Sequence, residues 1–199
     1  MRILDAALSS FAARGYEATS LDALAGSLAI TKQTILHHFG SKDLLLGAVL
    51  RRTVSEVALV IDESLARTPE SGWAALETVV RAVFSLAGRR PELLGFLREA
   101  GRLGHPHDER LVAELAPLTD RATVFLSAEM ATKFEARKVV LAAYAAVLGA
   151  VTEFEVLRQL GERPTGRLLL RRRRELLVYL SDLLGVTPTG RLRFPTGQP

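Results

Sequence analysis

A cluster of hydrogen-bonding side chains between residues 32 and 42 is the part of this sequence best suited to binding an anionic polymer. The cluster comprises Lys32, Gln33, Thr34, His37, His38 and Lys42. Side chains of this reach and chemistry donate to phosphate oxygens and pair with base edges in the major groove of DNA. The same residue types also form ordinary solvated helix faces, so the elements that position them decide between the two interpretations.

Three short helices and one long helix are predicted around this cluster. Apolar residues at three- and four-residue spacing predict a first helix that ends at Gly15 and a second helix that is entered through Thr19. A third helix starts at Thr31, and a fourth runs from residue 42 to about residue 66 with Ser41 as its N-cap. Lys42 would then lie at a helix N-terminus, where free N–H groups favour a phosphate.

The connection between the second and third helices points to a particular motif. Only Ala29 and Ile30 are predicted to join them, and so short a turn forces the steep crossing typical of a helix-turn-helix. Apolar contacts are expected to hold this crossing through Leu24, Leu28, Ile30, Ile35 and Phe39. The third helix then presents its polar side chains outward.

This stretch resembles the TetR family of bacterial transcriptional regulators over about the first 50 residues. The matching residues are Ile3-Leu4-Asp5-Ala6-Ala7, Phe11, Gly15-Tyr16, Ala18-Thr19-Ser20, Ala25, Thr31-Lys32-x-Thr34-Ile35-x-x-His38-Phe39 and Ser41-Lys42-Asp43-Leu44-Leu45. The resemblance implies a homodimer that places two recognition helices in successive major grooves of a palindromic operator. It also implies a repressor that a small molecule releases from double-stranded DNA.

Roles for individual residues follow from the resemblance. Thr19 and Lys42 would contact phosphate, Lys32, Gln33 and Thr34 would lie nearest the bases, and His37 and His38 would lie nearest the DNA backbone. Leu36 stands where the family often has tyrosine, so it would touch a thymine methyl instead of donating a hydrogen bond. Gln33 replaces a frequent glycine and would add a bidentate contact to adenine.

These departures, together with Leu28-Ala29 in place of the usual Ala-Gly, leave an alternative open. The chain would then be a helical ligand-binding or catalytic protein whose head no longer binds DNA. The Ser elbows, HExxH motifs and Gly-rich phosphate loops of enzymes do not stand out, so we expect no enzyme activity and no cofactor.

The remainder of the chain also has helical periodicity, so the predicted fold class is all-α. Further helices are expected over residues 71–87, 91–99, 108–130, 134–160 and 167–184. Pro117 is expected to kink or split one of them. We divide the chain into a helix-turn-helix DNA-binding domain (1–46), a helical ligand-binding and dimerisation domain (47–186) and a flexible tail (187–199).

A ligand pocket in the second domain is one prediction, and ordinary core packing of the same residues is the alternative. The candidate pocket residues are Trp73, Phe84, Phe96, Leu97, Leu103, Phe125 and Tyr144. Their large apolar side chains lie on helices that are expected to converge.

By analogy with the family, the last two helices are expected to form the dimer interface as a four-helix bundle. The candidate residues are Ala143, Val147, Ala150, Val151 and Phe154, with Leu169, Leu176, Leu177, Leu180 and Leu184. Packing within one subunit is the alternative. Arg173 belongs to the run Arg171–Arg174 but lies on this leucine stripe, so it is expected to need Glu153 or Glu155 as a partner.

Composition excludes several classes of site. With no cysteine, the chain has no disulfide, no Cys-ligated zinc, no iron–sulfur cluster and no thiol catalysis. One cluster has residue types found in metal sites, namely His105, His107 and Asp108. The sequence leaves open whether it binds a metal. The longest uncharged apolar run, residues 139–151, is too short to span a bilayer, so we expect a cytoplasmic protein without a membrane partner.

The basic excess is not concentrated in the predicted DNA-binding head. Residues 1–52 hold 6 basic and 4 acidic side chains, residues 53–162 hold 12 and 16, and residues 163–199 hold 8 and 2. Net charge alone therefore does not indicate DNA binding, and the prediction depends on the geometry between Thr19 and Lys42.

Overall fold

The computed structural model describes residues 2–67, 72–127, 133–161 and 166–184, and every regular element in these ranges is an α-helix. The predicted all-α fold class is therefore confirmed. The helices are α1 (Arg2–Arg14), α2 (Leu21–Ser27), α3 (Lys32–Phe39), α4 (Lys42–Ala66), α5 (Trp73–Arg89), α6 (Pro91–Arg102), α7 (His107–Ser127), α8 (Lys133–Gln159) and α9 (Gly166–Leu184).

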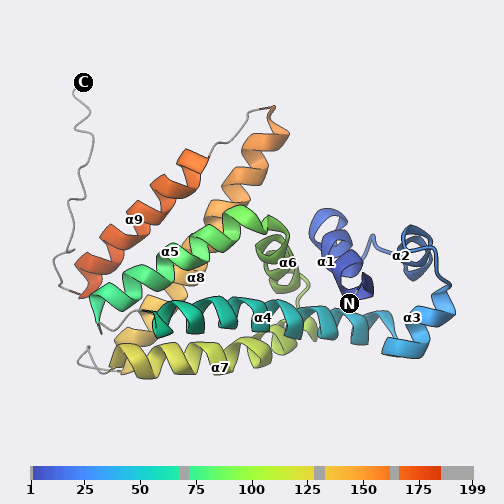
Figure 1. Cartoon of the computed structure of the whole chain (residues 1–199), viewed down its shortest axis with the longest axis horizontal. Helices are drawn as coiled ribbons and strands as arrows, with labels where there is room; N and C mark the ends of the chain where they lie inside the picture. The colour runs from blue at the N-terminus through green and yellow to red at the C-terminus, as the bar shows by residue number, and fades with distance from the viewer. Residues whose placement is uncertain (1, 68–71, 128–132, 162–165, 185–199) are drawn as a thin grey trace.

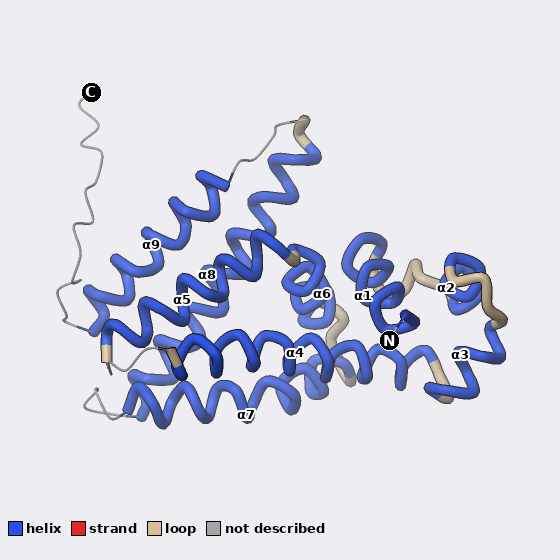
Figure 2. Tube along the Cα trace, in the orientation of Figure 1, coloured by secondary structure: helices blue, strands red, loops and turns tan. Residues whose placement is uncertain are grey.

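The helices form a small head on a larger body. Figure 1 shows α1, α2 and α3 gathered at one end of an elongated molecule, with α5, α8 and α9 toward the other end. The long helix α4 runs from the head into the body, and α7 packs along it. Figure 2 shows that short loops join the head helices to one another. Helix α4 therefore has its N-terminus in the head and its C-terminal half in the body.

Hydroxyl side chains begin three of the first four helices. Ser20, Thr31 and Ser41 each accept a hydrogen bond from the backbone N–H three residues later, which satisfies one of the free donors of the first turn. The predictions for Thr31, Ser41 and the span of α4 are confirmed. The prediction for the second helix is wrong by one residue, because Ser20 and not Thr19 is its N-cap.

The turn between α2 and α3 is longer than predicted. Helix α2 ends at Ser27 and Thr31 is the N-cap of α3, so four residues, and not two, lie between the helices. Ala29 reverses the chain with a φ of +54°. This left-handed conformation costs a residue other than glycine about 1–2 kcal/mol.

The five helices predicted for the body are all present, with their ends shifted by a few residues. Helix α7 continues through Pro117, so the predicted split of this helix is wrong. The predicted tail, residues 187–199, lies outside the described residues. None of the described helices is both long and apolar enough to cross a bilayer.

Helix α1 attaches the head to the body by packing on α6. The rings of Phe11 and Phe96 stack with their centroids 6.2 Å apart. Gly15 follows α1 with a φ of +86°, and a Cβ at this position would lie 2.8 Å from Oε1 of Glu99. The glycine therefore lets Glu99 approach, and the Tyr16 N–H donates to the same oxygen over 3.0 Å.

Candidate nucleic-acid interface

Helix α3 combines one fully buried anchor with an exposed polar face. Ile35 is 0% exposed and fixes the helix against the head core, where Leu24 and Leu45 are also fully buried. Gln33, His37 and His38 are exposed, whereas Lys32, Thr34 and Leu36 are half-buried. The structure thus brings six of the predicted DNA-contacting residues together on one short helix.

Two local contacts orient the first turn of α3. The hydroxyl groups of Thr31 and Thr34 share a hydrogen bond of 2.9 Å, in addition to the cap. The Lys32 ammonium donates to Oδ2 of Asp22 on α2 over 3.0 Å. The sequence analysis did not include Asp22 among the functional residues.

The two histidines lie next to one another at the C-terminal end of α3. The His37 and His38 rings meet edge to face, with centroids 5.7 Å apart. Positively charged or neutral, both rings have N–H groups that can donate to a phosphate. Among the described residues, no group of three His, Asp or Glu side chains is arranged to hold a metal ion.

Lys42 lies at the first turn of α4, next to α3 in the chain. Its ammonium group lies 4.2 Å from the centroid of the Tyr16 ring and donates to the Glu17 carbonyl over 3.4 Å. A cation over an aromatic face is held electrostatically without losing its charge. Tyr16 therefore holds Lys42 beside the helix N-terminus, a role that the position of Tyr16 after Gly15 did not suggest.

Thr19 does not have the role predicted for it. It is only 2% exposed, and its hydroxyl donates to the Gly15 carbonyl over 2.8 Å. A buried, satisfied hydroxyl is not available to a phosphate, so the predicted phosphate contact of Thr19 is wrong. The exposed hydroxyl at this position belongs to Ser20, the N-cap of α2.

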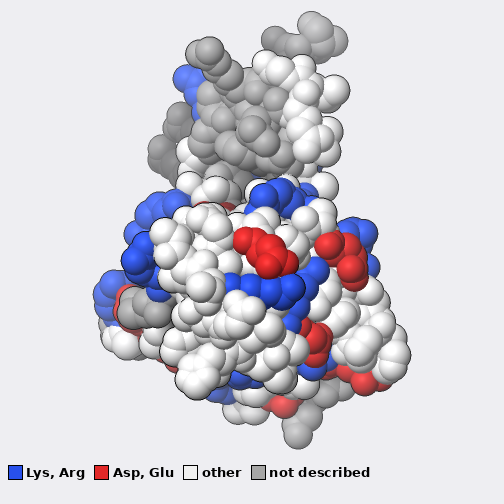
Figure 3. All heavy atoms as spheres, turned by 90° about the vertical axis from the view of Figure 1, so that its right-hand side faces the viewer, with Lys and Arg blue, Asp and Glu red and all other residues white. Residues whose placement is uncertain are grey.

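The head surface has charges of both signs. Figure 3 shows this end of the molecule, where basic and acidic side chains are intermixed with a large neutral area. Two ion pairs account for part of this mixing of charges, one between Lys32 and Asp22 and one between Arg52 and Asp5. Three carboxylates near α3 and α4 limit the positive potential there: Glu17, Asp22 and Asp43. We therefore do not expect a strong non-specific attraction for DNA.

A polar junction connects the head to the start of α7. Arg110 Nη1 lies 3.0 Å from Oδ2 of Asp43 and donates to the Asp43 carbonyl over 3.1 Å. His107 Nδ1 lies 3.2 Å from Oδ1 of Asp43, within ion-pair distance but without hydrogen-bond alignment. The His107 ring also packs at 5.3 Å from the ring of Tyr16. Asp43, the residue after Lys42, is thus held by α7.

The same contacts separate the three residues of the metal-like cluster. His107 faces Asp43, whereas the exposed His105 lies 3.2 Å from Oε1 of Glu109. Asp108 lies in the first turn of α7 and accepts from the Glu109 N–H. The three predicted ligands do not converge on one point.

A cavity of about 770 Å³ lies inside the body, within the range of about 300–1,000 Å³ typical of small-molecule sites. Of the seven predicted pocket residues, Leu97, Phe125 and Tyr144 line it. The other four are corrected, because Phe84 and Phe96 are buried in the core and Trp73 and Leu103 pack against that core outside the lining. Phe96 instead stacks on Phe11 of the head.

The predicted dimer stripe lies mostly inside the subunit. Val147, Leu176 and Leu180 are 9%, 4% and 0% exposed. Ala143 lines the cavity and Leu169 packs against the core near Gly88, while the side chains of Val151 and Phe154 lie outside the described residues. Val147, Leu177 and Leu180 therefore pack within the subunit, which corrects the prediction for these residues. Ala150 and Leu176 are also buried but line the groove between α8 and α9, so their place in an interface stays a prediction.

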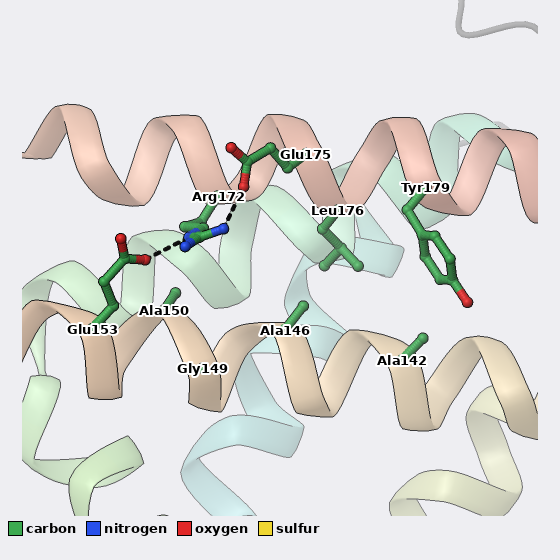
Figure 4. Close-up of a pocket in the computed structure, with 9 residues that line it drawn as sticks. All are labelled: Ala142, Ala146, Gly149, Ala150, Glu153, Arg172, Glu175, Leu176 and Tyr179. Atoms are coloured by element: carbon green, nitrogen blue, oxygen red, sulfur yellow. Dashed lines mark hydrogen bonds and ion pairs between the residues drawn. The ribbon is translucent and has the colours of Figure 1, made fainter.

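A different face of α8 and α9 is open. Figure 4 shows Ala142, Ala146 and Gly149 of α8 opposite Leu176 and Tyr179 of α9, with a groove of about 730 Å³ between them. Leu170, Tyr179 and Leu183 of α9 are 51%, 54% and 38% exposed. Large exposed apolar side chains beside small ones favour helix packing against another surface.

The arginine run pairs differently from the prediction. Glu153 accepts from Arg171 over 3.2 Å and from Arg172 over 2.5 Å, and Arg172 also donates to Glu175, as Figure 4 shows for Arg172. Arg173 is half-buried next to Arg81 and Glu77 of α5, and burial lowers its pKa from the usual range. The predicted pairing of Arg173 with Glu153 is therefore wrong, and the side chain of the other candidate, Glu155, lies outside the described residues.

Comparison with known sequences gives a match for the head. Residues 3–49 match the family model described as bacterial regulatory proteins, tetR family. The Transposon Tn10 TetC protein of Escherichia coli is 33% identical over 69 residues, which cover 35% of this chain and 34% of that protein. The match thus spans about a third of the relative's length.

Comparison with solved structures gives matches over nearly the whole chain. The transcriptional regulator FadR of Bacillus subtilis, solved in complex with stearoyl-CoA, has a TM-score of 0.75 at 18% identity, covering 90% of this chain and 96% of its own. A TetR transcriptional regulator of Chloroflexus aurantiacus has a TM-score of 0.73 at 19% identity, covering 91% and 93%. At these identities the likeness establishes the fold of head and body together.

Proposed function

We propose that the protein is a DNA-binding transcriptional regulator, because residues 3–49 match the family model described as bacterial regulatory proteins, tetR family. It acts as a repressor that binds a palindromic operator as a homodimer and leaves it when a small molecule binds in the body. The observation that supports DNA binding most is α3, a capped helix after a reversed turn, with its polar face exposed beside Lys42.

Each residue of this face has a proposed role. Gln33 and Thr34 lie in the first half of α3, so they read base edges together with Lys32 once Lys32 leaves Asp22. His37 and His38, at the other end, contact the DNA backbone. Leu36 packs against a thymine methyl.

Lys42 fixes the position of the head on a phosphate. Lys42 is the first residue of α4, and the free N–H groups of that first turn favour the same anion. Tyr16 restricts the lysine to this position before DNA arrives, so less side-chain entropy is lost on binding.

The homodimer forms through the open face of α8 and α9. Ala142, Ala146 and Gly149 are spaced by three and four residues, which places them on one side of α8. Together with Tyr179 and Leu183 of α9 they offer a surface on which the same helices of a second copy would pack as a four-helix bundle.

Helix α7 provides a route from the cavity to the head. Leu111 and Leu115 of α7 line the cavity, and Arg110, in the turn before them, holds Asp43. A ligand that shifts α7 would therefore also shift the start of α4, where Lys42 lies. Release requires that the ligand binds the DNA-free arrangement more tightly than the DNA-bound one.

The test is binding to the duplex DNA upstream of the protein's own gene at two salt concentrations. We expect a specific complex that weakens steeply with salt, and Lys42→Ala should reduce the slope of log affinity against log salt by about 1 for each lost phosphate contact. Lys138→Ala, which removes an exposed lysine of α8, is the matched control and should bind like the parent.

Two outcomes would overturn the proposal. No salt-sensitive specific complex, or equal binding by Lys42→Ala, would favour the alternative of a helical ligand-binding or catalytic protein whose head does not bind DNA. Circular dichroism of each variant shows whether the head remains folded.

A further inference from the structure

The walls of the body cavity are almost entirely aliphatic. Helices α4, α5, α6, α7, α8 and α9 contribute to the lining. The buried aliphatic lining residues include Val57, Val80, Leu97, Leu111, Val139 and Val147, all less than a tenth exposed. A charged group placed among such side chains loses its hydration without compensation, which costs several kcal/mol even after relaxation.

The charged side chains in the described lining are Asp62, Asp120 and Arg121. Arg121 of α7 donates to both carboxylate oxygens of Asp62 of α4, over 3.3 and 3.2 Å. All three side chains are exposed, so they lie at the edge of the cavity and not at its centre. The guanidinium already has its carboxylate partner, so a ligand anion would have to compete with Asp62.

Two uncharged polar side chains belong to the described lining, Thr119 of α7 and Tyr144 of α8. The Thr119 hydroxyl donates to the Ala116 carbonyl over 2.9 Å, so Tyr144 is the hydroxyl that is left to donate to a ligand. Its side chain is half-buried, and burial raises the pKa of its phenol above the usual value, so the hydroxyl stays protonated. Among the described residues, no hydrogen-bonding partner contacts this hydroxyl. A protonated phenol in an apolar wall is suited to donate one hydrogen bond to an uncharged oxygen.

We propose that the cavity takes an uncharged hydrocarbon with a single hydroxyl or carbonyl oxygen, and that Tyr144 donates a hydrogen bond to that oxygen. The regulatory role of this ligand rests on the proposed function. Binding of the ligand to the cavity does not depend on DNA binding. The aliphatic walls favour binding of a hydrocarbon chain. Arg121 is already paired with Asp62, so it does not favour a ligand that has a carboxylate.

The test compares three ligands of equal chain length, dodecanol, dodecanoate and dodecane, by fluorescence competition and thermal shift on the whole protein without DNA. We expect dodecanol to bind at least about tenfold more tightly than dodecanoate, because only the carboxylate must be desolvated as a charge. Tyr144→Phe should weaken dodecanol by about 2- to 12-fold, the value of one hydrogen bond, and leave dodecane unchanged.

Two further variants make the result specific. Ser55→Ala removes an exposed hydroxyl of α4 outside this cavity and should bind all three ligands like the parent. Ala143→Phe fills the cavity and should abolish dodecanol binding. Tighter binding of dodecanoate, an unaffected Tyr144→Phe, or no binding of dodecanol would each overturn the proposal. Because DNA is absent, a failure of DNA binding leaves this result unaffected.

Discussion

At the scale of single residues, the most consequential contact is the ion pair between Lys32 and Asp22. Both side chains are accessible, at 42% and 70% exposure, so the pair adds little to stability. It does, however, keep the Lys32 ammonium on α2 and places a negative charge beside the recognition helix. In the proposed complex, DNA binding would separate this ion pair, and Asp22 would oppose the phosphates.

Replacing Asp22 by asparagine should raise DNA affinity by about 3- to 10-fold at low salt, with little change in stability. The reason is that Lys32 becomes free to contact DNA and one repulsive charge is lost. Fluorescence anisotropy with labelled duplex measures the effect. Asp182→Asn, on α9, is the control for a general change in net charge, and an Asp22→Asn protein that binds less tightly would contradict this role.

Glu99 predicts a pH dependence of the attachment between head and body. Its pKa is lowered by the hydrogen bonds from Arg102, and the Tyr16 N–H donates to it as well. A carboxyl group whose folded pKa is depressed stabilises the fold above its unfolded pKa of about 4.3. This stabilisation is lost as the pH falls through the folded value.

Glu99→Gln should therefore lower the free energy of unfolding at neutral pH by about 1–3 kcal/mol, and the difference from the parent should shrink below about pH 4. Urea unfolding over a pH series measures both quantities. Glu63→Gln changes an exposed glutamate of α4 and should leave the curve unchanged. A constant difference across the series would contradict the assigned pKa direction.

At the scale of elements, the turn between α2 and α3 sets the direction of the recognition helix. Ala29 adopts a left-handed backbone that glycine reaches without steric cost. The structure thus keeps a strained residue at the point where the helix-turn-helix reverses. No side-chain interaction offsets this strain locally, because Ala29 is exposed.

Ala29→Gly should raise the free energy of unfolding by about 0.5–1 kcal/mol, since the relieved strain exceeds the added entropy of the unfolded chain. Thermal unfolding followed by circular dichroism measures it. Ala145→Gly, at an exposed position within α8, should instead destabilise the protein by about 1 kcal/mol. Equal destabilisation by both substitutions would show that the turn is not strained.

The helices themselves were predictable because caps and apolar spacing are local signals. Thr31, Ser41 and the apolar stripes gave α3 and α4 within a residue. The sequence did not show whether Thr19 or Ser20 is the N-cap of α2, because both residue types are good caps. Only the folded head shows that the Thr19 side chain is buried.

The faces of α8 and α9 were not predictable from their own sequence. Both helices have apolar residues on more than one side, so Val147 and Leu176 fit an interface between subunits as well as a core within one. The partners of Arg172 and Arg173 depend on how α5, α8 and α9 are placed relative to one another, which is long-range information.

At the scale of the whole molecule, the head has few basic side chains beyond those on α3 and α4. In the proposed homodimer, DNA recognition would therefore come from two correctly spaced heads and specific contacts more than from a general positive field. The Asp43 junction ties this spacing to α7, and α7 in turn lines the cavity. DNA would then stabilise one arrangement of the head and α7, and a small molecule in the cavity would stabilise another.

The measurement that tests this account most directly is selection of binding sites from a pool of random duplex DNA by the full-length protein. We predict an enriched palindrome whose half-sites lie one helical turn, about 34–36 Å, apart, and a symmetric change in both half-sites for Gln33→Ala. Failure to enrich any sequence, or enrichment of a site that Gln33→Ala leaves unchanged, would contradict recognition of DNA through α3.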